Sequence, residues 1–350
     1  MNRPILLLGI ALLFAGCTST PEPQPVQMTV FYGTDRQVVS AENPEDTYGA
    51  ALGVLTFGSA EVSIPPDHRM GRIEEPSLMN FEFSPQEDRH VVLRKVLPEL
   101  QPTFLARLQD QIRKTGNESV FIFVHGYNVS FAGAARRTAQ IAYDLEWPGT
   151  AVFYSWPSHA STDVYGADRD NALAAVADLT AFIESVAVYS GAAKVHVIAH
   201  SMGNEPLLTA LARHAASTSS PGVPLVDEVV LAAPDVGADE FRALIAKAAP
   251  AAHRFTLYVS ANDTALQASS LVNEAPRAGD SSGGVLVLPG VDTIDASAAE
   301  SDMVGHSYYG ESRVILADVF SLLKTGMSPD QRFGLHAASV NGQKYWILQP

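Results

Sequence analysis

The chain has 350 residues, of which 47% are hydrophobic and 17% are charged. This is enough apolar material for a large core and too little charge for a disordered chain. Lys and Arg total 23 against 38 Asp and Glu, a formal net charge of -15, and no basic run is present. Nucleic-acid binding needs Lys and Arg that neutralise phosphates, so we expect no nucleic-acid partner. Because Cys17 is the single cysteine, the sequence excludes an intrachain disulfide framework and a cysteine-rich metal cluster.

The first 16 residues are typical of a secretory signal peptide. Arg3 precedes the apolar run ILLLGIALLFAG, which is shorter than the ~20 residues that span a bilayer. The segment LFAG before Cys17 resembles the bacterial lipobox, and this resemblance implies cleavage before Cys17 and lipidation of that residue. Thr18, in place of Asp, resembles the outer-membrane sorting pattern. We therefore expect a lipid anchor in the bacterial cell envelope, at the outer membrane facing the periplasm. The alternative is an ordinary or uncleaved signal with an incidental cysteine.

The mature chain is expected to contain one folded domain. Residues 17–27 have Pro at every second position over part of their length and predict a semi-extended tether. Residues 28–325 predict a single α/β domain, and residues 326–350 a polar C-terminal tail.

Strands come first in this domain, and strands then alternate with helices. The expected strands are Met28–Tyr32, Gly53–Phe57, Ala60–Ile64, His90–Lys95, Ser119–Val124, Ala151–Ser155, Lys194–Ala199, Glu228–Ala233, Arg254–Ser260 and Val285–Leu288. The expected helices are Phe131–Leu145, Ala167–Tyr189, Asn204–His214, Ala238–Ala249 and Glu311–Leu323. Such alternation indicates βαβ crossovers, hence a mostly parallel central sheet with helices on both faces. Chemistry is then expected at the carboxyl ends of the strands.

The most informative motif is Ala199-His200-Ser201-Met202-Gly203, between an expected strand and an expected helix. It matches the G-x-S-x-G nucleophile elbow with Ala at the first small position. The serine of such an elbow occupies a tight turn, so the residues two positions on either side must be small. The turn exposes the hydroxyl and directs helix N–H groups at the reaction centre. We predict Ser201 as a nucleophile; the alternative is a buried serine in an ordinary turn.

A serine nucleophile needs a base, and in this fold class the chain order is Ser, acid, His. His306 lies in a loop between the last expected strand and the last expected helix, where the base belongs. His214 falls in the helix after the serine, His253 precedes a strand, and His336 falls in the C-terminal tail. Position therefore predicts His306 as the base.

Two aspartates compete for the acid position. Asp263 follows the expected strand at 254–260, the usual position, and is the predicted acid, although it could instead cap the following helix. Asp235, one strand earlier, is the alternative acid and could instead cap or fix the loop before the helix at Ala238. Weaker candidates lie in the loop leading to the histidine: Asp292, Asp295 and Asp302.

Backbone N–H groups are expected to form the oxyanion hole. One belongs to Met202, directly after the nucleophile, and the other to Tyr127, in the His-Gly-Tyr-Asn loop after the strand at 119–124. His125 and His200 are expected to be hydrogen-bonded loop histidines. Neither has metal-ligand spacing, so the sequence predicts no metal and no cofactor.

A wider set of motifs is shared with known hydrolases. It comprises Phe31–Arg36 (FYGTDR), Val62–Pro65, Phe123–Asn128, Tyr154–Ser158 (YSWPS), Ala199–Asn204, Leu231–Asp235 and Val291–Ser297. These segments resemble the α/β-hydrolase superfamily and, more narrowly, an uncharacterised bacterial esterase/lipase-like branch of unknown function. The resemblance implies an α/β-hydrolase fold with extra N-terminal strands and Ser201, Asp263 and His306 as the triad. Arg36 and Trp156 are expected to be scaffold residues.

We therefore expect a serine hydrolase that cleaves carboxylic ester bonds of a small acyl substrate. Thioester or amide hydrolysis and acyl transfer use the same triad. The alternative from another class is a non-catalytic envelope lipoprotein that binds a partner on a hydrolase scaffold. A lipase is a further alternative, although the sequence shows no long amphipathic lid. Protein partners are not readable from the sequence.

Overall fold

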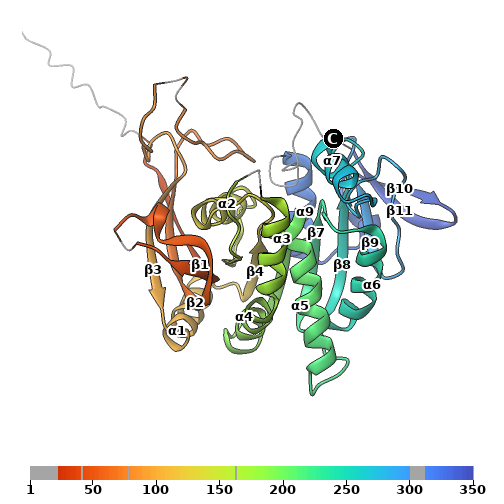
Figure 1. The fold of residues 1–350 in the computed structure, drawn as a ribbon, viewed down its shortest axis with the longest axis horizontal. Helices are drawn as coiled ribbons and strands as arrows, with labels where there is room; N and C mark the ends of the chain where they lie inside the picture. Colours follow the sequence, from red (N-terminus) through yellow and green to blue (C-terminus); the bar gives the residue numbers. More distant parts are fainter. Residues whose placement is uncertain are drawn as a thin grey trace, which may run out of the picture.

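The computed structural model describes residues 23–40, 42–77, 79, 81–161, 164–299 and 312–349. One eleven-stranded sheet runs through these residues in the order β10-β11-β9-β8-β7-β6-β4-β5-β1-β2-β3 (Figure 1). The strands are β1 Val26–Val38, β2 Tyr48–Ile64, β3 Val92–Glu99, β4 Ser119–Val124, β5 Thr150–Ser155, β6 Lys194–His200, β7 Val226–Ala232, β8 Ala252–Val259, β9 Val291–Asp295, β10 Leu335–Val340 and β11 Gln343–Leu348. The α-helices are α1 Gln101–Thr115, α2 Phe131–Asp144, α3 Tyr165–Ala174, α4 Val176–Tyr189, α5 Asn204–Ser217, α6 Ala238–Ala248, α7 Thr264–Val272 and α9 Arg313–Thr325.

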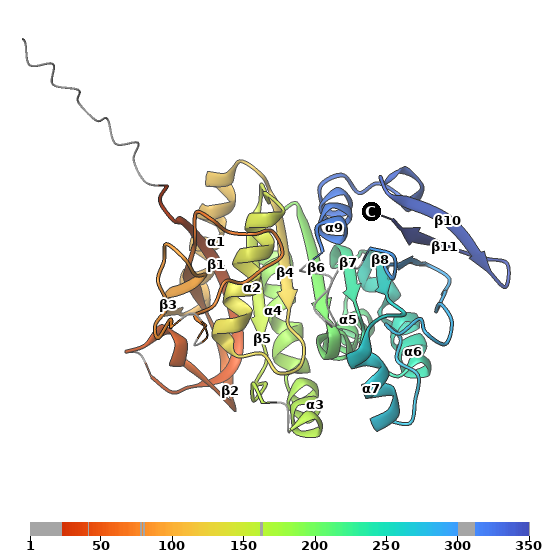
Figure 2. The same cartoon turned by 90° about the horizontal axis from the view of Figure 1, so that it is seen from above.

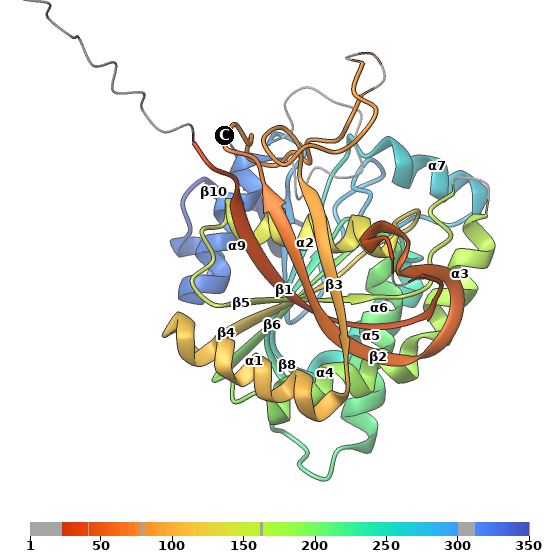
Figure 3. The ribbon, with the colours of Figure 1, turned by 90° about the vertical axis from the view of Figure 1, so that its left-hand side faces the viewer.

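The centre of the sheet is parallel, as the alternation of strands and helices predicts. Strands β5, β4, β6, β7, β8 and β9 pair in parallel, and β1 joins them in parallel through β5. The apolar run of β4 is buried on both faces because helices cover both sides of the sheet. Figure 3 shows α2 and α9 on one face and α1, α4, α5 and α6 on the other. The expected α/β architecture is confirmed.

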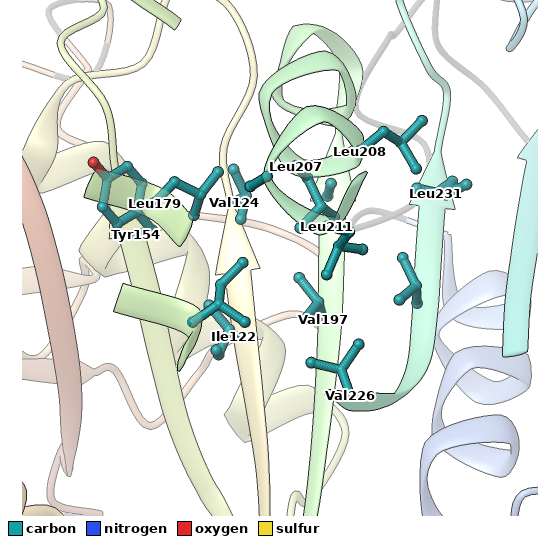
Figure 4. Close-up of a cluster of buried hydrophobic side chains, with 14 of the residues drawn as sticks. Ile122, Val124, Tyr154, Leu179, Val197, Leu207, Leu208, Leu211, Val226 and Leu231 are labelled. Atoms are coloured by element: carbon teal, nitrogen blue, oxygen red, sulfur yellow. The ribbon is translucent and has the colours of Figure 1, made fainter. Parts of the chain in front are cut away.

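Two hydrophobic cores hold these layers together. In one core, side chains of α1, α4, α5 and α6 pack on the sheet, and in the other, side chains of α2 and α9 do so. Figure 4 shows how α5 contributes to the first core: Leu211 lies over Val197 of β6, Leu207 on the side of Val124 of β4 and Leu208 on the side of Leu231 of β7. This packing fixes the helix that follows Ser201 against the strand that precedes it, so the turn between them is held from both sides.

The N-terminal strands are longer than the short runs in the sequence indicate. The predicted runs at 53–57 and 60–64 are parts of one strand, β2, which pairs with β1 and β3. The tether expected over 17–27 ends earlier than predicted, since Val26 and Gln27 already pair with Ile64 and Ser63. Strand pairing uses backbone groups, so the polar side chain of Gln27 does not prevent it, and this side chain donates to the Ser63 hydroxyl.

Three expectations about helices and late strands were wrong or incomplete. The helix expected over 167–189 is two helices, α3 and α4, which bend by 50° at Ala175. The sequence prediction omits helix α1, because the helix has few apolar residues. Only Phe104, Leu108 and Ile112 of this helix are buried. The strand expected at 285–288 does not form, and β9 begins at Val291, three residues after the expected end of that strand.

Residues 326–350 are not the polar tail that the sequence predicts. Strands β10 and β11 form an antiparallel hairpin, and β11 pairs in parallel with β9 at the edge of the sheet. Trp346 and Leu348 are buried in the core of the α2 and α9 face. Burial alternates at the end of β11, where Ile347 is half-buried between Trp346 and Leu348, but the sequence is continuously apolar there and so does not show the alternation.

Within the described residues, the length and apolarity needed to cross a membrane occur in no single helix. The bent pair α3 and α4 meets the length and composition criteria only when the two helices are taken together.

A buried histidine fastens the loop after β2 to the end of α2. Nδ1 of His68 lies 2.8 Å from Oε2 of Glu74, and its Nε2 lies 2.9 Å from Oδ1 of Asp144. Asp144 also accepts the N–H of Gly71 at 2.6 Å. Burial lowers the pKa of His68, but the two carboxylates outweigh burial and raise that pKa to about 9.

We expect this cluster to make stability fall at alkaline pH. The folded pKa of His68 lies above the unfolded value of ~6.5, so its contribution is complete below pH ~6.5 and is lost as pH rises through about 9. In His68→Gln, the free energy of unfolding should be lower by about 2 kcal/mol near pH 6, and the difference should vanish near pH ~10. Urea unfolding across this range measures it. The exposed His253→Gln serves as control, and a pH-independent difference would contradict the assignment.

Candidate active site

The turn that carries Ser201 has the geometry of a nucleophile elbow. Strand β6 ends at His200, a 3-10 turn spans Ser201–Gly203, and α5 begins at Asn204. Ser201 has φ 53°, in the left-handed region that L-residues rarely adopt. Such strain is kept only where the surroundings over-determine the backbone, and it is typical of functional positions.

Small residues surround Ser201 because the chain passes very close to it. A Cβ on Gly203 would lie 2.3 Å from the carbonyl oxygen of His125, and one on Gly126 would lie 2.7 Å from the Cβ of Ser201. Ala199, two positions before the serine, is fully buried. The prediction that Ala fits at the first small position of the motif is confirmed.

Gly203→Ala should therefore damage both stability and activity. The new methyl group would meet a fixed backbone oxygen, and overpacking of this kind costs about 2 kcal/mol. The midpoint of urea unfolding should fall, and hydrolysis should fall with it because the turn must shift. Gly166→Ala in α3 is the matched control, since nothing lies within 4 Å of its Cβ position. Equal midpoints for the two variants would contradict the close approach.

The backbone of the elbow is tied to the neighbouring strand end. The carbonyl oxygen of Ser201 accepts the side-chain amide of Asn204 at 2.8 Å and the N–H of Asp235 at 3.2 Å. Asn204 also donates to the carbonyl of Ala232 at 3.3 Å. The carboxyl ends of β6 and β7 are thereby held together, which fixes the serine relative to the sheet.

The loop after β4, which carries the predicted second oxyanion donor, lies against the elbow. His125 is buried, with Nδ1 2.8 Å from the Gly126 carbonyl oxygen and Nε2 3.1 Å from the Ser155 hydroxyl. Its ring stacks on Trp156 at 4.7 Å, and the indole donates to the His125 carbonyl at 2.8 Å. Burial, aided by the nearby Arg36, lowers the pKa of His125 to about 3, so this ring stays neutral. The prediction that His125 is a hydrogen-bonded loop histidine is confirmed.

Arg36 and Asp168 form hydrogen bonds that hold the loops after β4 and β5 in place. Arg36 is buried and donates to the carbonyl oxygens of Val129 at 2.7 Å and Ser158 at 2.9 Å, and to the Ser155 hydroxyl at 2.9 Å. Asp168 accepts from the Ser158 hydroxyl at 2.5 Å. These bonds connect β1 with the loops after β4 and β5. The expectation that Arg36 is a scaffold residue tying the N-terminal strands to the sheet is confirmed, as is the scaffold role of Trp156.

Tyr127 and Met202 lie at the two sides of this junction. Met202 is buried at the start of the turn, next to the N-terminus of α5, where N–H groups point outward along the helix axis. The ring of Tyr127 packs edge-on against Tyr165 of α3 at 5.3 Å. The two loops that carry the predicted donors are therefore neighbours, since Gly126 touches Ser201.

Asp263 stands at the carboxyl end of β8 and is buried. Its side chain accepts the N–H of Leu266 at 2.9 Å and so caps α7. Capping was the alternative role for Asp263, and it does not exclude the catalytic one because a carboxylate has further acceptor sites. The adjacent residues reach the loop after β9: Ala261 and Asn262 bond to Ser297 at 2.8 and 2.9 Å.

Asp235 is engaged in a separate cluster. Its Oδ1 lies 2.8 Å from Nε of Arg277 and accepts the Ser269 hydroxyl at 2.6 Å, and its Oδ2 accepts the Tyr165 hydroxyl at 2.8 Å. Figures 1 and 2 show α3 and α7, which supply two of these groups, at the same end of the molecule. The cluster fixes the loop before α6, so the loop-fixing role of Asp235 is confirmed. The cap of α6 itself is Gly237, without a side-chain bond.

Three predicted residues lie outside the described residues: the base His306, the weaker acid candidate Asp302 and the lipidation site Cys17. His306 falls between Ala299 and Ser312. These two residues are in contact, since the Ser312 hydroxyl donates to the Ala299 carbonyl at 3.2 Å. This point adjoins the loop after β9, which contacts the loop of Asp263 through Ser297. Across 23–40, 42–77, 79, 81–161, 164–299 and 312–349, no group of three or more His, Cys, Asp or Glu could hold a metal ion.

Sequence reasoning missed the residues that hold the site together. Tyr165 and Arg277 both contact Asp235, and Asp168 accepts the N–H of Asn128, although each of these pairs lies at least 40 residues apart in the chain. No local pattern marks them. Only the alternation of strands and helices, which brings strand ends to one edge, could have suggested that polar residues in these loops meet.

The family comparison decides where this fold belongs. The family described as "Alpha/beta hydrolase of unknown function (DUF900)" matches residues 102–323, more than half of the chain. The chain belongs to this family. Its fold is the α/β-hydrolase fold, with a mostly parallel sheet and helices on both sides. No curated protein matches the chain in sequence.

Solved structures give a weaker likeness. A lipase-esterase related protein from Clostridium acetobutylicum is 11% identical, with a TM-score of 0.35, covering 61% of this chain and 96% of that one. An esterase from Pyrobaculum calidifontis is 12% identical, with a TM-score of 0.37, covering 77% and 82%. An α/β serine hydrolase homologue from Coxiella burnetii is 15% identical, with a TM-score of 0.34, covering 60% and 85%.

Proposed function

We propose that this α/β hydrolase is a serine esterase that uses Ser201, His306 and Asp263. The observation that carries the proposal is the strained turn at Ser201, with φ 53° and no space for a Cβ at Gly203. A non-catalytic scaffold has no need of such a turn. Asp263 supports the proposal because it is buried at the end of β8, beside the loop that leads to residue 306.

The reaction proceeds through an acyl-enzyme. Ser201 Oγ attacks the ester carbonyl carbon while His306 accepts the hydroxyl proton, and the N–H groups of Met202 and Tyr127 hold the developing oxyanion. The tetrahedral intermediate then expels the alcohol, which takes the proton from His306 as it leaves. Water, deprotonated by the same histidine, releases the acid and restores the serine. Asp263 keeps the imidazole in the required tautomer throughout.

We further propose that Cys17 carries lipid and that the protein works at the envelope membrane, at the outer membrane facing the periplasm. The lipobox-like segment before Cys17 supports this, as does the start of the first strand at Val26, which leaves nine residues for a tether. The mass of the N-terminal peptide tests it, because lipidation adds the mass of diacylglycerol and acyl groups to Cys17.

Chromogenic esters with acyl chains from about two to about sixteen carbons test the esterase proposal, because pocket burial sets chain-length preference. We expect hydrolysis of short acyl chains and a trapped acyl mass on the peptide that contains Ser201. Thioesters and amides of the same acyl groups distinguish ester cleavage from the related reactions. Failure to hydrolyse any of these substrates, without an acyl adduct, would favour the non-catalytic lipoprotein.

A further inference from the structure

Three large apolar side chains stand in solvent on the long loop between β2 and β3. Met79, Phe81 and Phe83 are 91%, 81% and 81% exposed. The intervening Glu82 is buried, so the backbone alternates and directs both phenylalanines outward. We call Met79, Phe81 and Phe83 the apolar tip. Isolated exposed hydrophobic residues are common on soluble proteins, but a cluster of this kind marks an interaction site.

The apolar tip is held in place by polar contacts at its centre. The Glu82 carboxylate accepts the N–H of Ser77 at 3.0 Å and lies 3.1 Å from Nε2 of His90 and 2.5 Å from a guanidinium nitrogen of Arg89. These bonds join the outgoing and returning halves of the loop. The buried Glu82 carboxylate and its partners therefore hold the loop in the conformation that exposes the two phenylalanine rings to solvent.

The base of this loop adjoins the first residues of β1. Val26 pairs with Ile64, the residue at which the loop leaves β2, and Gln27 lies 3.4 Å from Glu87 near the end of the loop. In Figures 1 and 3, the loop (orange) stands on the same side of the molecule as the start of β1 (red). The same region exposes Val26 and, in the first part of the loop, Met70.

Chain length places this side near the membrane if Cys17 is anchored there. Eight residues separate Cys17 from Val26, and an extended chain spans at most ~3.5 Å per residue, so the start of β1 stays within about 30 Å of the bilayer surface. The net charge of -15 opposes attraction to anionic lipids. Contact with the bilayer on this side must therefore come from apolar side chains that insert into the lipid, and the apolar tip supplies such side chains.

We infer that the apolar tip inserts into the bilayer that holds the N-terminal anchor and so gives the domain a second membrane contact and a fixed orientation. This inference rests on the proposed lipidation of Cys17 and is independent of the esterase chemistry. A lipidated Cys17 holds only the end of the N-terminal segment at the membrane, so a second contact is what sets the orientation of the domain. Because the second contact is apolar, it should persist at high salt.

The test uses the lipidated full-length protein in vesicles of phosphatidylethanolamine and phosphatidylglycerol. Lipidation consumes the Cys17 thiol, so Met79→Cys supplies the one reactive thiol for an environment-sensitive fluorophore. Val188→Cys, on the exposed face of α4, is the matched control. Nitroxide lipids should quench the probe at residue 79 at least about threefold more than the probe at residue 188, in low and high salt alike, because an inserted probe touches the nitroxides. Adding Phe81→Ser and Phe83→Ser should remove this difference without changing ester hydrolysis.

The outcomes separate the anchor from the apolar tip. Equal quenching at residues 79 and 188, with lipid mass present on Cys17, would overturn the inference and leave the anchor standing. If Cys17 carries no lipid mass, the lipid-anchor proposal is wrong, and the two probes are then attached to protein with Cys17→Ser. In that protein, selective quenching at residue 79 would still support insertion of the apolar tip, and equal quenching at the two positions would overturn it. A probe at residue 79 that responds to protein concentration without vesicles would show that a second copy covers the tip, which also overturns the inference.

Discussion

Ser201→Ala is expected to lower kcat/KM for ester hydrolysis by at least about 10⁴-fold and to abolish labelling by a fluorophosphonate probe. Removing the nucleophile of a serine triad removes the acyl-enzyme route, and the remaining oxyanion donors support little turnover. The substitution leaves the Cβ in place, so the strained turn at φ 53° and the packing of Gly126 are unchanged. The free energy of unfolding should therefore stay within about 1 kcal/mol of the parent.

Ser217→Ala is the matched control, since this serine lies exposed at the end of the same helix that follows Ser201. It should keep full labelling and full activity. Intact-protein mass after probe treatment measures labelling, and initial rates on the preferred ester measure turnover. Activity that survives in folded Ser201→Ala would refute the nucleophile assignment and with it the proposed mechanism.

The fold was predictable from sequence where physical signals are local. Strand β4 is a continuous apolar run, and the elbow combines a buried strand, a serine between small residues and a helix, so both can be read without a structure. The hairpin of β10 and β11 was not predictable in the same way. Its stability depends on pairing with β9, about fifty residues earlier in the chain, and on burial of Trp346.

The candidate site also has parts that local sequence signals predict and parts that they do not. The positions of Ser201 and of the two candidate acids follow from where their strands end, because parallel strands bring their carboxyl ends to one edge. Strand order favours Asp263 over Asp235 as the acid but does not exclude Asp235, since both follow strands. The structure adds the contact of Asp235 with Arg277, which comes from a loop 42 residues further along the chain and has no motif of its own.

This difference predicts opposite consequences for the two Asp→Asn variants. Asp263→Asn should lower kcat for ester hydrolysis by about 10⁴-fold, because an amide fixes the wrong histidine tautomer. It should change stability little, since Asn caps a helix about as well as Asp and can still accept the Leu266 N–H. Asp235→Asn should instead lower the free energy of unfolding by about 3 kcal/mol, because it leaves the buried Arg277 without a charged partner.

The pair of measurements assigns the acid because the two effects fall on different observables. Asp235→Asn still leaves Ser201 and the loop of Asp263 in place, so its kcat should fall by no more than about tenfold at temperatures where the protein stays folded. Urea unfolding and initial rates on the same preparations give both quantities for each variant. If Asp235→Asn loses about 10⁴-fold in kcat while Asp263→Asn stays active, the catalytic acid is at the end of β7. A loss of about this size is what replacing a triad carboxylate by an amide causes. Comparable losses in both would mean that Arg277 and its partners position the triad, because the loop before α6 bonds directly to the Ser201 carbonyl through the Asp235 N–H.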